Sequence, residues 1–395
     1  MHILFVIENN PVPADRRVWP EVLTARELGH SVSVICPKDP KRSADTMQIP
    51  NGIRIYTHPR LVEASSKAGF IIEYIWALLA EFVLSVRIYV ASPFQVIHAG
   101  NPPDHVFIIA ALYKIFGVRF IFDHHDLAPE NYYAIFGRKG LIYYALLCME
   151  RLSFLTADIV ISTNASYKKV AIERGRKDSR DVLVVRNAPL PSRIRHTPPN
   201  PAFRAGFPYV VGYVGTIARQ DALDNLVRII AYLVKERRRS DIRFIVIGSG
   251  THWAEVVRLA QEAGIERYVW FTGSVSDEML CEILCSVDVC VNPEFRNEFT
   301  DKSTMLKIMD YMAFGKPIVQ FRTTEGEVTA ASAAVYVDEN SIPQFGEVLI
   351  ELLEDRERRM MMGHHGRTRM EKELCWEKQK MELQKAYARL HPANA

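Results

Sequence analysis

Residues 301–319, DKSTMLKIMDYMAFGKPIV, contain the group of side chains best suited to bind an anion. A turn of charged and hydroxyl side chains precedes a short amphipathic helix, and Lys302 and Lys307 add positive charge. Backbone N–H groups and the helix dipole favour anions at such a turn. Asp310 follows Lys302 at a spacing that predicts roughly the same side of the helix. The pattern predicts a nucleoside diphosphate site, with ribose hydroxyls near Asp310; the alternative is an ordinary βα unit with solvated charges.

The composition is that of a globular protein with room for two or three domains in 395 residues. A net charge of +3 does not indicate nucleic-acid binding. The first 200 residues contain 24 Lys/Arg and 18 Asp/Glu, so they carry +6, while the remainder carries −3. This asymmetry, unless it is compositional scatter, predicts an anionic surface as partner for the first half and a small ligand for the second.

The six cysteines do not indicate a disulfide framework or a zinc site. No CxxC pair is present, and Cys281 and Cys285 lack a histidine or second pair to complete a metal site. They are expected to be core residues in a reducing cytosol. The N-terminus starts directly with an apolar strand pattern and lacks the layout of a secretory signal.

Residues 70–90, FIIEYIWALLAEFVLSVRIYV, are long enough to span a bilayer but are interrupted by Glu73, Glu81 and Arg87. We expect a helix buried in the first domain, with a membrane contact along one side as the alternative. A helix that spans the membrane is the weakest of the three interpretations.

Apolar β-branched runs alternate with helical stretches from end to end, which predicts βαβ units and a parallel sheet covered on both faces. Six prolines within 187–208 interrupt the alternation and predict an extended linker. The predicted fold class is therefore α/β, with two Rossmann-like doubly wound domains facing across a cleft. The boundaries expected are 1–190, a linker at 191–208, a second domain at 209–375, and a final helix at 376–395 that can pack back on the first domain.

Ligands of open α/β sheets bind beyond the carboxyl ends of the strands, which identifies the loops to inspect. In the second half, four of five such loops carry Gly, Ser or Thr, which let backbone approach a phosphate. The GxG at Gly248 and Gly250 has no third glycine at the spacing of a dinucleotide fingerprint, so NAD or FAD is a minor interpretation.

In the first half, Asp123-His124-His125-Asp126 ends a predicted strand and is the best catalytic candidate. It supplies an imidazole that titrates near neutrality beside carboxylates that hold or tune it. Adjacent histidines on a strand point to opposite faces, so only one is expected to face the ligand. No second cluster completes a metal geometry, and no DxD ends a strand, so a diphosphate would depend on cationic side chains and helix dipoles.

Ten segments occur in an order that resembles family 4 glycosyltransferases of the GT-B fold, and the variant DKST…DYMA is similar to a subgroup of bacterial polysaccharide and O-antigen assembly. The segments are GHSVSVICP, VIHAGNPPD, FDHHD, ADIVIST, VVRNAP, GYVGTI, VIGSG, FTGSV, DVCVNP and DYMAFGKPIV. The resemblance implies a retaining sugar transfer from a nucleotide-diphosphate sugar, without metal or cofactor. It implies a donor on the C-terminal domain and an acceptor on the N-terminal one.

Carried over residue by residue, the resemblance implies that Asp310 binds the donor ribose and that the pair His125-Asp126 lies near the acceptor. The family's first Glu of E-x7-E falls on Lys302, and its usual Arg and Lys fall on Thr216 and Asp221. We therefore expect Lys302, Lys307 and Arg219 to replace the missing cations. The donor residues predicted are Gly215, Thr216, Arg219, Gly248, Ser249, Ser303, Thr304, Lys307 and Asp310.

Residues 9–17 replace the family's Gly-rich acceptor loop, so the acceptor is predicted from polar loop positions of the first half. These positions are Asn10, Asp15, Arg17, Asn101 and Glu130. Catalysis is assigned to His125, oriented by Asp126, and to Lys302, which would stabilise the leaving diphosphate.

The expected partners are a nucleotide-sugar donor, a lipid-linked or glycan acceptor and an anionic membrane surface at the cytoplasmic face. The expected activity is that of a hexosyltransferase or a related transferase of lipopolysaccharide or exopolysaccharide synthesis. The alternatives are a nucleotide-sugar epimerase or hydrolase, or a catalytically silent partner of an assembly complex.

Overall fold

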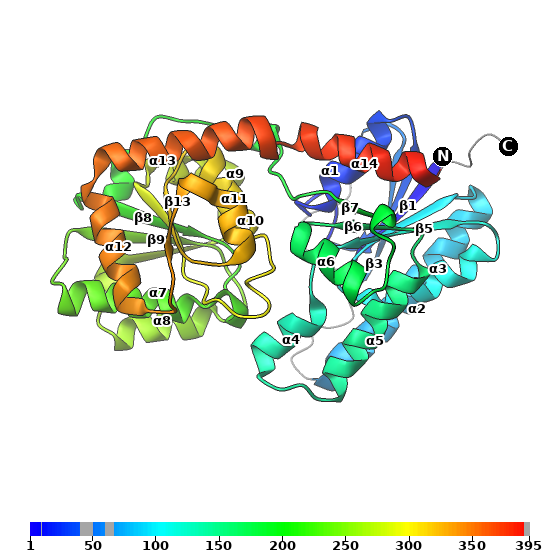
Figure 1. The fold of residues 1–395 in the computed structure, drawn as a ribbon, viewed down its shortest axis with the longest axis horizontal. Helices are drawn as coiled ribbons and strands as arrows, with labels where there is room; N and C mark the ends of the chain where they lie inside the picture. Colours follow the sequence, from blue (N-terminus) through cyan, green and yellow to red (C-terminus); the bar gives the residue numbers. More distant parts are fainter. Residues whose placement is uncertain (9, 40–49, 60–66, 391–395) are drawn as a thin grey trace. The chain divides into compact units, whose positions relative to one another are not determined.

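The computed structural model describes the chain except for residues 9, 40–49, 60–66 and 391–395, and it divides into two compact units. The first unit comprises Met1–Asn187 and Glu377–Ala395, and the second Ala188–Trp376. Each unit has one parallel sheet with helices on both faces (Figure 1). The α/β prediction of two Rossmann-like domains is therefore confirmed.

In the first unit the strands of the described residues are ordered β3-β2-β1-β4-β5-β6-β7. Their bounds are β1 (His2–Val6), β2 (Ser31–Pro37), β3 (Ile53–His58), β4 (Val96–Gly100), β5 (Arg119–His124), β6 (Ile159–Ser162) and β7 (Val182–Val184). The helices are α1 (Val18–Glu27), α2 (Lys67–Ala91), α3 (Phe107–Lys114), α4 (Ala128–Phe136), α5 (Leu141–Thr156), α6 (Ala165–Glu173) and α14 (Trp376–Leu390).

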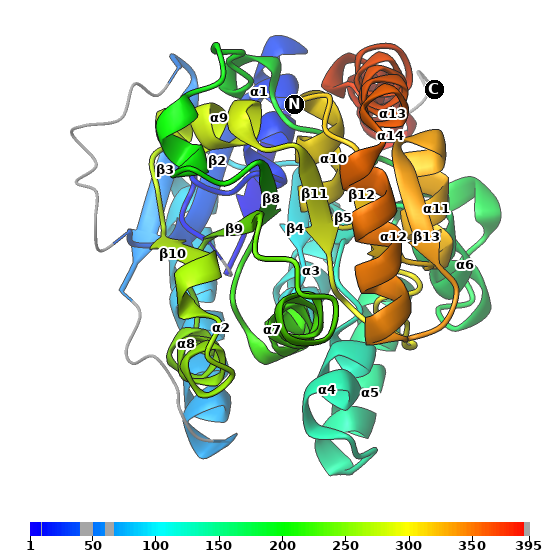
Figure 2. The same cartoon turned by 90° about the vertical axis from the view of Figure 1, so that its left-hand side faces the viewer.

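In the second unit the order is β10-β9-β8-β11-β12-β13, which Figure 2 shows from one side to the other. The strands are β8 (Tyr209–Val214), β9 (Ile242–Ile247), β10 (Val269–Gly273), β11 (Val289–Asn292), β12 (Ile318–Phe321) and β13 (Ala334–Val337). The helices are α7 (Leu223–Ala231), α8 (Trp253–Glu262), α9 (Asp277–Ser286), α10 (Leu306–Ala313), α11 (Thr324–Ala330), α12 (Ile342–Glu354) and α13 (Arg356–Arg369).

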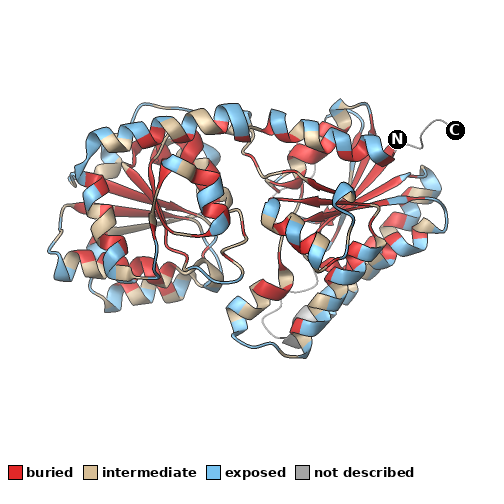
Figure 3. Cartoon of the chain, in the orientation of Figure 1, coloured by how far each residue is buried: buried red, intermediate tan, exposed pale blue. Residues whose placement is uncertain are grey.

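Both faces of each sheet are covered, so most strand residues are buried (Figure 3). In β8, Val211 and Tyr213 belong to the core on one face, whereas Val210 and Val214 belong to the core on the other. This alternation follows from the two-residue period of a strand and explains why such strands are nearly continuous apolar runs. Side-chain caps fix several helix starts; Ser276 accepts from the N–H of Met279, for example.

The final helix packs on the first unit, as the sequence predicted. Tyr387 is buried there and its hydroxyl lies 3.0 Å from Nδ1 of His98, while Lys380 pairs with Glu27 of α1. The chain therefore leaves the first unit at Asn187 and returns to it at Glu377.

The proline-rich stretch is ordered rather than a free linker, and it belongs to the second unit. The N–H of Thr197 donates to Sγ of Cys285, and the N–H of Asn200 donates to Oγ of Ser286, both on α9. Its prolines open two 3-10 turns, Pro191–Arg193 and Pro201–Arg204, because proline fits the first position of a helical turn.

Helix α2 corrects the expectation of a helix buried in the first domain. Within 72–91, the part of the helix whose burial is described, only the stripe of Ala77, Glu81, Ser85 and Ile88 is deeply buried, at the spacing of one helix face. Ile72–Ala91 has a mean hydropathy of 1.6, enough by length and composition to cross a bilayer, yet only 22% of that apolar window is buried. Large apolar side chains are exposed on its other sides.

Candidate active site

The site candidate of the first unit lies where the strand order reverses, between β1 and β4. Loops that follow the two strands on either side of such a point diverge and leave room for a ligand. The loop after β1 carries Asp15 and Arg17, the loop after β4 begins at Asn101, and β5 beside it ends at His124.

His125 is held by Asp123 and not, as predicted, by Asp126. Its Nδ1 lies 3.2 Å from Oδ2 of Asp123, and its side chain is 16% exposed. An Nδ1–H that donates to this carboxylate leaves the Nε2 lone pair to act on a substrate. Residues two apart on an extended strand share a face, so the sequence period could have identified Asp123.

His124 points to the opposite face, as the strand period predicted. It is fully buried against Phe154 and Tyr167, and its Nε2 lies 3.3 Å from Oε1 of Glu150. The two histidines therefore diverge and do not form a joint metal site.

Asp123 is itself fixed by a buried guanidinium. The Nε and Nη2 of Arg17 donate to the two Asp123 oxygens at 3.2 and 2.7 Å, and Nη2 lies 3.0 Å from Oε1 of Glu21. Burial alone would raise the pKa of Asp123, but Arg17 and His125 hold it well below its usual value. Burial raises the pKa of Glu21, since one guanidinium cannot fully compensate two desolvated carboxylates. Asp123 is therefore a fixed negative charge beneath His125.

Asn101 holds the backbone of the loop that carries His125 and Asp126. Its Oδ1 accepts from the N–H groups of His125 and Asp126 at 2.8 and 3.0 Å, and its Nδ2 donates to the carbonyl of Asp126 at 2.7 Å. Because Asn101 is fully buried, it positions His125 rather than contacting the acceptor as predicted.

The other predicted acceptor residues also differ in exposure. Asp15 is buried and accepts from the N–H groups of Arg17 and Val18 at the start of α1. Glu130 is buried and bonded to Arg174 at 2.8 Å. Internal contacts therefore occupy the side chains of Asp15, Arg17 and Glu130, which were predicted to bind the acceptor. Asn10 is exposed, although its Nδ2 donates to Oδ2 of Asp15 at 3.1 Å, and its acceptor role stays a prediction.

Gly100, the last residue of β4, makes room for the imidazole. A Cβ built there would lie 2.8 Å from Cε1 of His125, closer than side-chain packing allows. We expect Gly100→Ala to displace His125 and to lower kcat/KM about 10²-fold, since a shift near 1 Å has that effect on catalytic geometry. The measurement is kcat/KM together with the melting temperature. Gly140→Ala, which has open space around its Cβ, is the matched control, and equal activities of both variants would contradict the prediction.

The candidate of the second unit lies at the equivalent reversal, between β8 and β11. The N–H of Ile217 donates to the carbonyl of Ser249 at 3.1 Å, so the loops after β8 and β9 touch. A Cβ on Gly248 would lie 1.8 Å from the carbonyl oxygen of Gly215, and φ of Gly248 is +136°. The predicted glycines are therefore needed for loop-to-loop contact, and they bring Thr216, Arg219 and Ser249 to one exposed edge.

Lys307 is not the free cation that the sequence pattern predicted. It is buried, and its Nζ contacts Oε1 of Glu294 and lies 3.1 Å from Oη of Tyr213 and 3.7 Å from Asp221. Burial would lower the pKa of Lys307, but Glu294 and Tyr213 outweigh it and the pKa lies well above its usual value. Lys307 therefore fixes the loops after β8 and β11 to each other, across the point where the strand order reverses.

Lys302 precedes α10, which begins at Leu306, so the two predicted residues Lys302 and Asp310 do not share one helix face. Both are half-exposed, as is Thr304, whereas Ser303 is buried and donates to the carbonyl of Phe299. Asp301 bonds the N–H of Thr324 at the start of α11 and pairs with Arg296. The turn is thus held by Asp301, and Lys302, Thr304 and Asp310 remain its candidate ligand contacts.

Two family profiles match the chain, one in each unit. "Glycosyltransferase Family 4" matches residues 22–188, and "Glycosyl transferases group 1" matches residues 208–355. The chain belongs to glycosyltransferase family 4. The resemblance found in the sequence motifs is therefore confirmed at the level of the family.

Two curated relatives are distant and match in part. A D-inositol 3-phosphate glycosyltransferase of Corynebacterium jeikeium is 27% identical over 48% of this chain and 46% of its own. A GDP-mannose-dependent monoacylated alpha-(1-6)-phosphatidylinositol monomannoside mannosyltransferase of Corynebacterium glutamicum is 25% identical over 48% of this chain and 52% of its own. The chain thus spans about half the length of these curated relatives.

Solved structures share the fold along the whole chain. Sucrose-phosphate synthase of Thermosynechococcus elongatus has a TM-score of 0.79 at 16% identity and covers 99% of both chains. Anabaena HepE in complex with UDP and glucose has a TM-score of 0.75 at 13% identity, covering 98% of this family 4 chain and 100% of its own. At these identities the likeness concerns the GT-B fold alone.

Proposed function

We propose that this glycosyltransferase moves a sugar from a nucleoside-diphosphate donor, bound by the second unit, to a lipid-linked glycan held by the first. The transfer retains the anomeric configuration and needs no metal at the donor. The observation that carries the proposal is the group of polar side chains gathered at the strand reversal of the second unit. Lys302 and Arg219 supply cations there, and Asp310 supplies the carboxylate that binds ribose hydroxyls. HepE, a protein of the same fold, was solved with UDP and with UDP-glucose.

His125 would position an acceptor hydroxyl or a hydroxyl of the donor sugar through Nε2. Asp123, kept ionised by Arg17, stabilises positive charge that develops on the imidazole. The diphosphate leaves as its charge grows, so Lys302 would stabilise the transition state more than the ground state.

Replacing Lys302 by alanine should lower kcat/KM at least about tenfold, because one cation is withdrawn from the departing diphosphate. The assay supplies UDP- and GDP-sugars with a bacterial lipid extract in the presence of EDTA and follows sugar transfer to lipid. Lys235→Ala, an exposed lysine of the second unit, is the control. A loss below tenfold would remove Lys302 from this role. Free nucleotide diphosphate without glycolipid would favour a hydrolase, a new nucleotide sugar an epimerase, and no donor binding by calorimetry a silent partner.

A lipid-linked acceptor would place the first unit on a membrane, at the cytoplasmic face where nucleotide sugars are made available. Helix α2 supports this, since its exposed side carries large apolar residues that a water-facing helix would avoid. They are Ile72, Tyr74, Ile75, Leu79, Phe82, Val83, Val86 and Val90. Ile115 and Phe116, just after α3, are 80% and 67% exposed. The net positive charge of the first 200 residues favours an anionic lipid surface.

The double change Val83→Glu with Val90→Glu should reduce binding to anionic liposomes at least about tenfold, because two side chains lose apolar burial and gain like charge. Both valines are exposed, at 63% and 80%, so the fold should be unaffected. Cosedimentation with phosphatidylglycerol vesicles at low salt measures the effect. Met360→Glu with Met361→Glu, an exposed pair on α13, should bind as the parent does. Parent protein that ignores these vesicles would end the membrane part of the proposal.

A further inference from the structure

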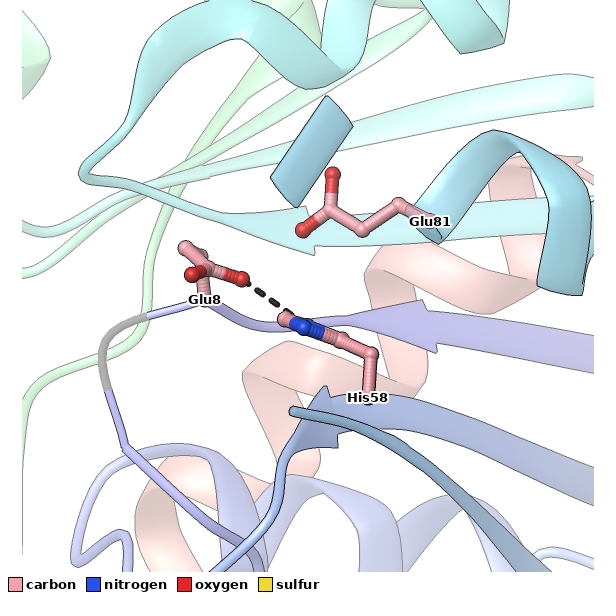
Figure 4. A group of neighbouring side chains, drawn as sticks. All are labelled: Glu8, His58 and Glu81. Carbon is pink, nitrogen blue, oxygen red and sulfur yellow. Dashed lines mark ion pairs between the residues drawn. The ribbon is translucent and has the colours of Figure 1, made fainter. Parts of the chain in front are cut away.

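A second cluster of titratable side chains in the first unit takes no part in the proposed transfer. Glu8 follows β1, His58 is the last residue of β3, and Glu81 lies in the middle of α2. All three are buried, with 8%, 3% and 0% of their surface exposed. Figure 4 shows the two carboxylates and the imidazole directed toward one another from these three separate segments.

The geometry of the cluster suits a cation. Oε2 of Glu8 lies 3.0 Å from Nε2 of His58, and one potential ligand atom from each of the three residues lies within 4.8 Å of the other two. Oε1 of Glu81 is buried and accepts no hydrogen bond from the residues that the structure describes. Around a tetrahedral ion at about 2.0–2.2 Å, ligand atoms lie roughly 3.3–3.6 Å apart, so small side-chain movements would close the site.

His105 supplies the outer support that metal-binding carboxylates usually have. Its Nε2 lies 2.9 Å from Oε2 of Glu81, which orients that carboxylate and leaves Oε1 available. Ser85, one turn further along α2, bonds Tyr113 and fixes the helix beside it. The set is therefore preorganised by residues outside the three candidate ligands.

A comparable group elsewhere in the unit already contains a cation. Glu21, His98 and Asp123 also converge, but Arg17 lies 3.0 and 2.7 Å from the two carboxylates. At Glu8, His58 and Glu81 no arginine or lysine forms an ion pair within the described part of the chain. The side chains that pair with the two carboxylates there are the imidazoles of His58 and His105.

We propose that Glu8, His58 and Glu81 bind one divalent transition-metal ion, with Zn²⁺ as the test ion. Two carboxylates and a neutral imidazole balance its charge, and nitrogen with oxygen ligands is a set that zinc accepts. The ion would tie the end of β1, and hence the start of the loop with Asn10, to β3 and α2. Its role is structural, distinct from the donor site, where no metal is proposed.

Without an ion, Glu8 and His58 pair with each other, since Oε2 of Glu8 lies 3.0 Å from Nε2 of His58. Carboxylates and imidazole bind a metal only in their deprotonated forms, so the affinity for the ion should fall as the pH is lowered from 8 to 6. The pair of Glu8 and His58 alone predicts no uptake of metal.

The test uses the full chain after EDTA treatment and dialysis. We expect it to take up one equivalent of Zn²⁺ by equilibrium dialysis, to gain melting temperature with added Zn²⁺, and to show visible Co²⁺ absorption. Glu81→Gln should bind at least about tenfold more weakly, and His105→Gln about tenfold more weakly. His364→Gln, an exposed histidine of the second unit, should bind as the parent does.

Parent protein that takes up no Zn²⁺ would overturn the proposal. Loss of Zn²⁺ binding in His364→Gln, with binding retained in Glu81→Gln, would overturn it too, because the ion would then bind adventitiously at the surface. The measurement on the parent protein does not depend on any variant. A parent that takes up no Zn²⁺ therefore contradicts the proposal even if Glu81→Gln folds poorly. Sugar transfer is measured separately with EDTA present, so failure here leaves the transferase proposal standing.

Discussion

Replacing His125 by alanine should lower kcat about 10²-fold or more while leaving the melting temperature nearly unchanged. The imidazole is the titratable group at the strand reversal of the first unit that is both partly exposed and fixed, through Nδ1, by a buried carboxylate. Its loss removes positioning and proton handling at the acceptor or sugar hydroxyl, effects that each reach that size. Because 16% of the side chain is exposed, little core packing is lost.

The measurement is steady-state kinetics with donor and acceptor varied in turn. A fall in kcat with donor KM preserved is expected if, as proposed, the second unit binds the donor. His364→Ala on α13 is the matched control and should retain parent activity. A His125→Ala enzyme within threefold of the parent would show that the imidazole has no part in the reaction.

Replacing Arg17 by glutamine should destabilise the protein by about 3–5 kcal/mol, because two buried carboxylates lose their common cation. Arg17 is 6% exposed, and Asp123 and Glu21 are fully buried, so water cannot replace the lost charge. For a unit of this size the melting temperature should fall by roughly 6–20 °C. Thermal unfolding followed by circular dichroism measures the change in melting temperature. Arg151 is exposed, so Arg151→Gln is the control, and its free energy of unfolding should lie within about 0.5 kcal/mol of that of the parent.

The pH dependence of this effect has a definite sign. In the parent, the pKa of Asp123 is held below its usual value, so its contribution to stability is present above roughly pH 4 and is lost as the pH falls through the folded value. In Arg17→Gln the buried carboxylates lose their cation and their pKa values rise, so the variant gains stability as they take up protons. The difference in the free energy of unfolding between parent and variant should become smaller as the pH is lowered from 8 to 5. A difference that does not change with pH would mean that Arg17 stabilises the protein through packing and not through charge.

The order of elements was predictable because each has a local cause. The alternation of apolar β-branched runs with helical stretches predicted the parallel sheets that the described residues form, and the final helix, Trp376–Leu390, was correctly expected to be helical. Helices α4 (Ala128–Phe136) and α11 (Thr324–Ala330) are not evident from the apolar pattern of the sequence. Each is short and begins within a few residues of the end of a strand, where a brief helical pattern is hard to distinguish from a loop.

The candidate site was predictable in part. The DKST segment does follow β11, at the strand reversal of the second unit where a doubly wound sheet places its ligands, and the DHHD segment ends β5, the strand next to β4 at the reversal of the first unit. The exposure of individual residues was not predictable, since a loop charge that binds a ligand and one that pairs internally look alike in sequence. Arg17 and Asp123 are 106 positions apart, and Lys307 and Tyr213 are 94 apart.

By itself, the sequence determined the α/β class, the two sheets and the loops that carry polar side chains, because strand and helix periods are local and parallel strands share one carboxyl edge. Only the tertiary structure decided that Arg17, Asn101, Glu130 and Lys307 are buried and internally paired, and that Asp123 holds His125. The reason is that burial and pairing depend on which distant segments meet, and a local pattern contains no information about the partner. For the same reason the convergence of Glu8, His58 and Glu81 appeared only once three separate segments were packed together.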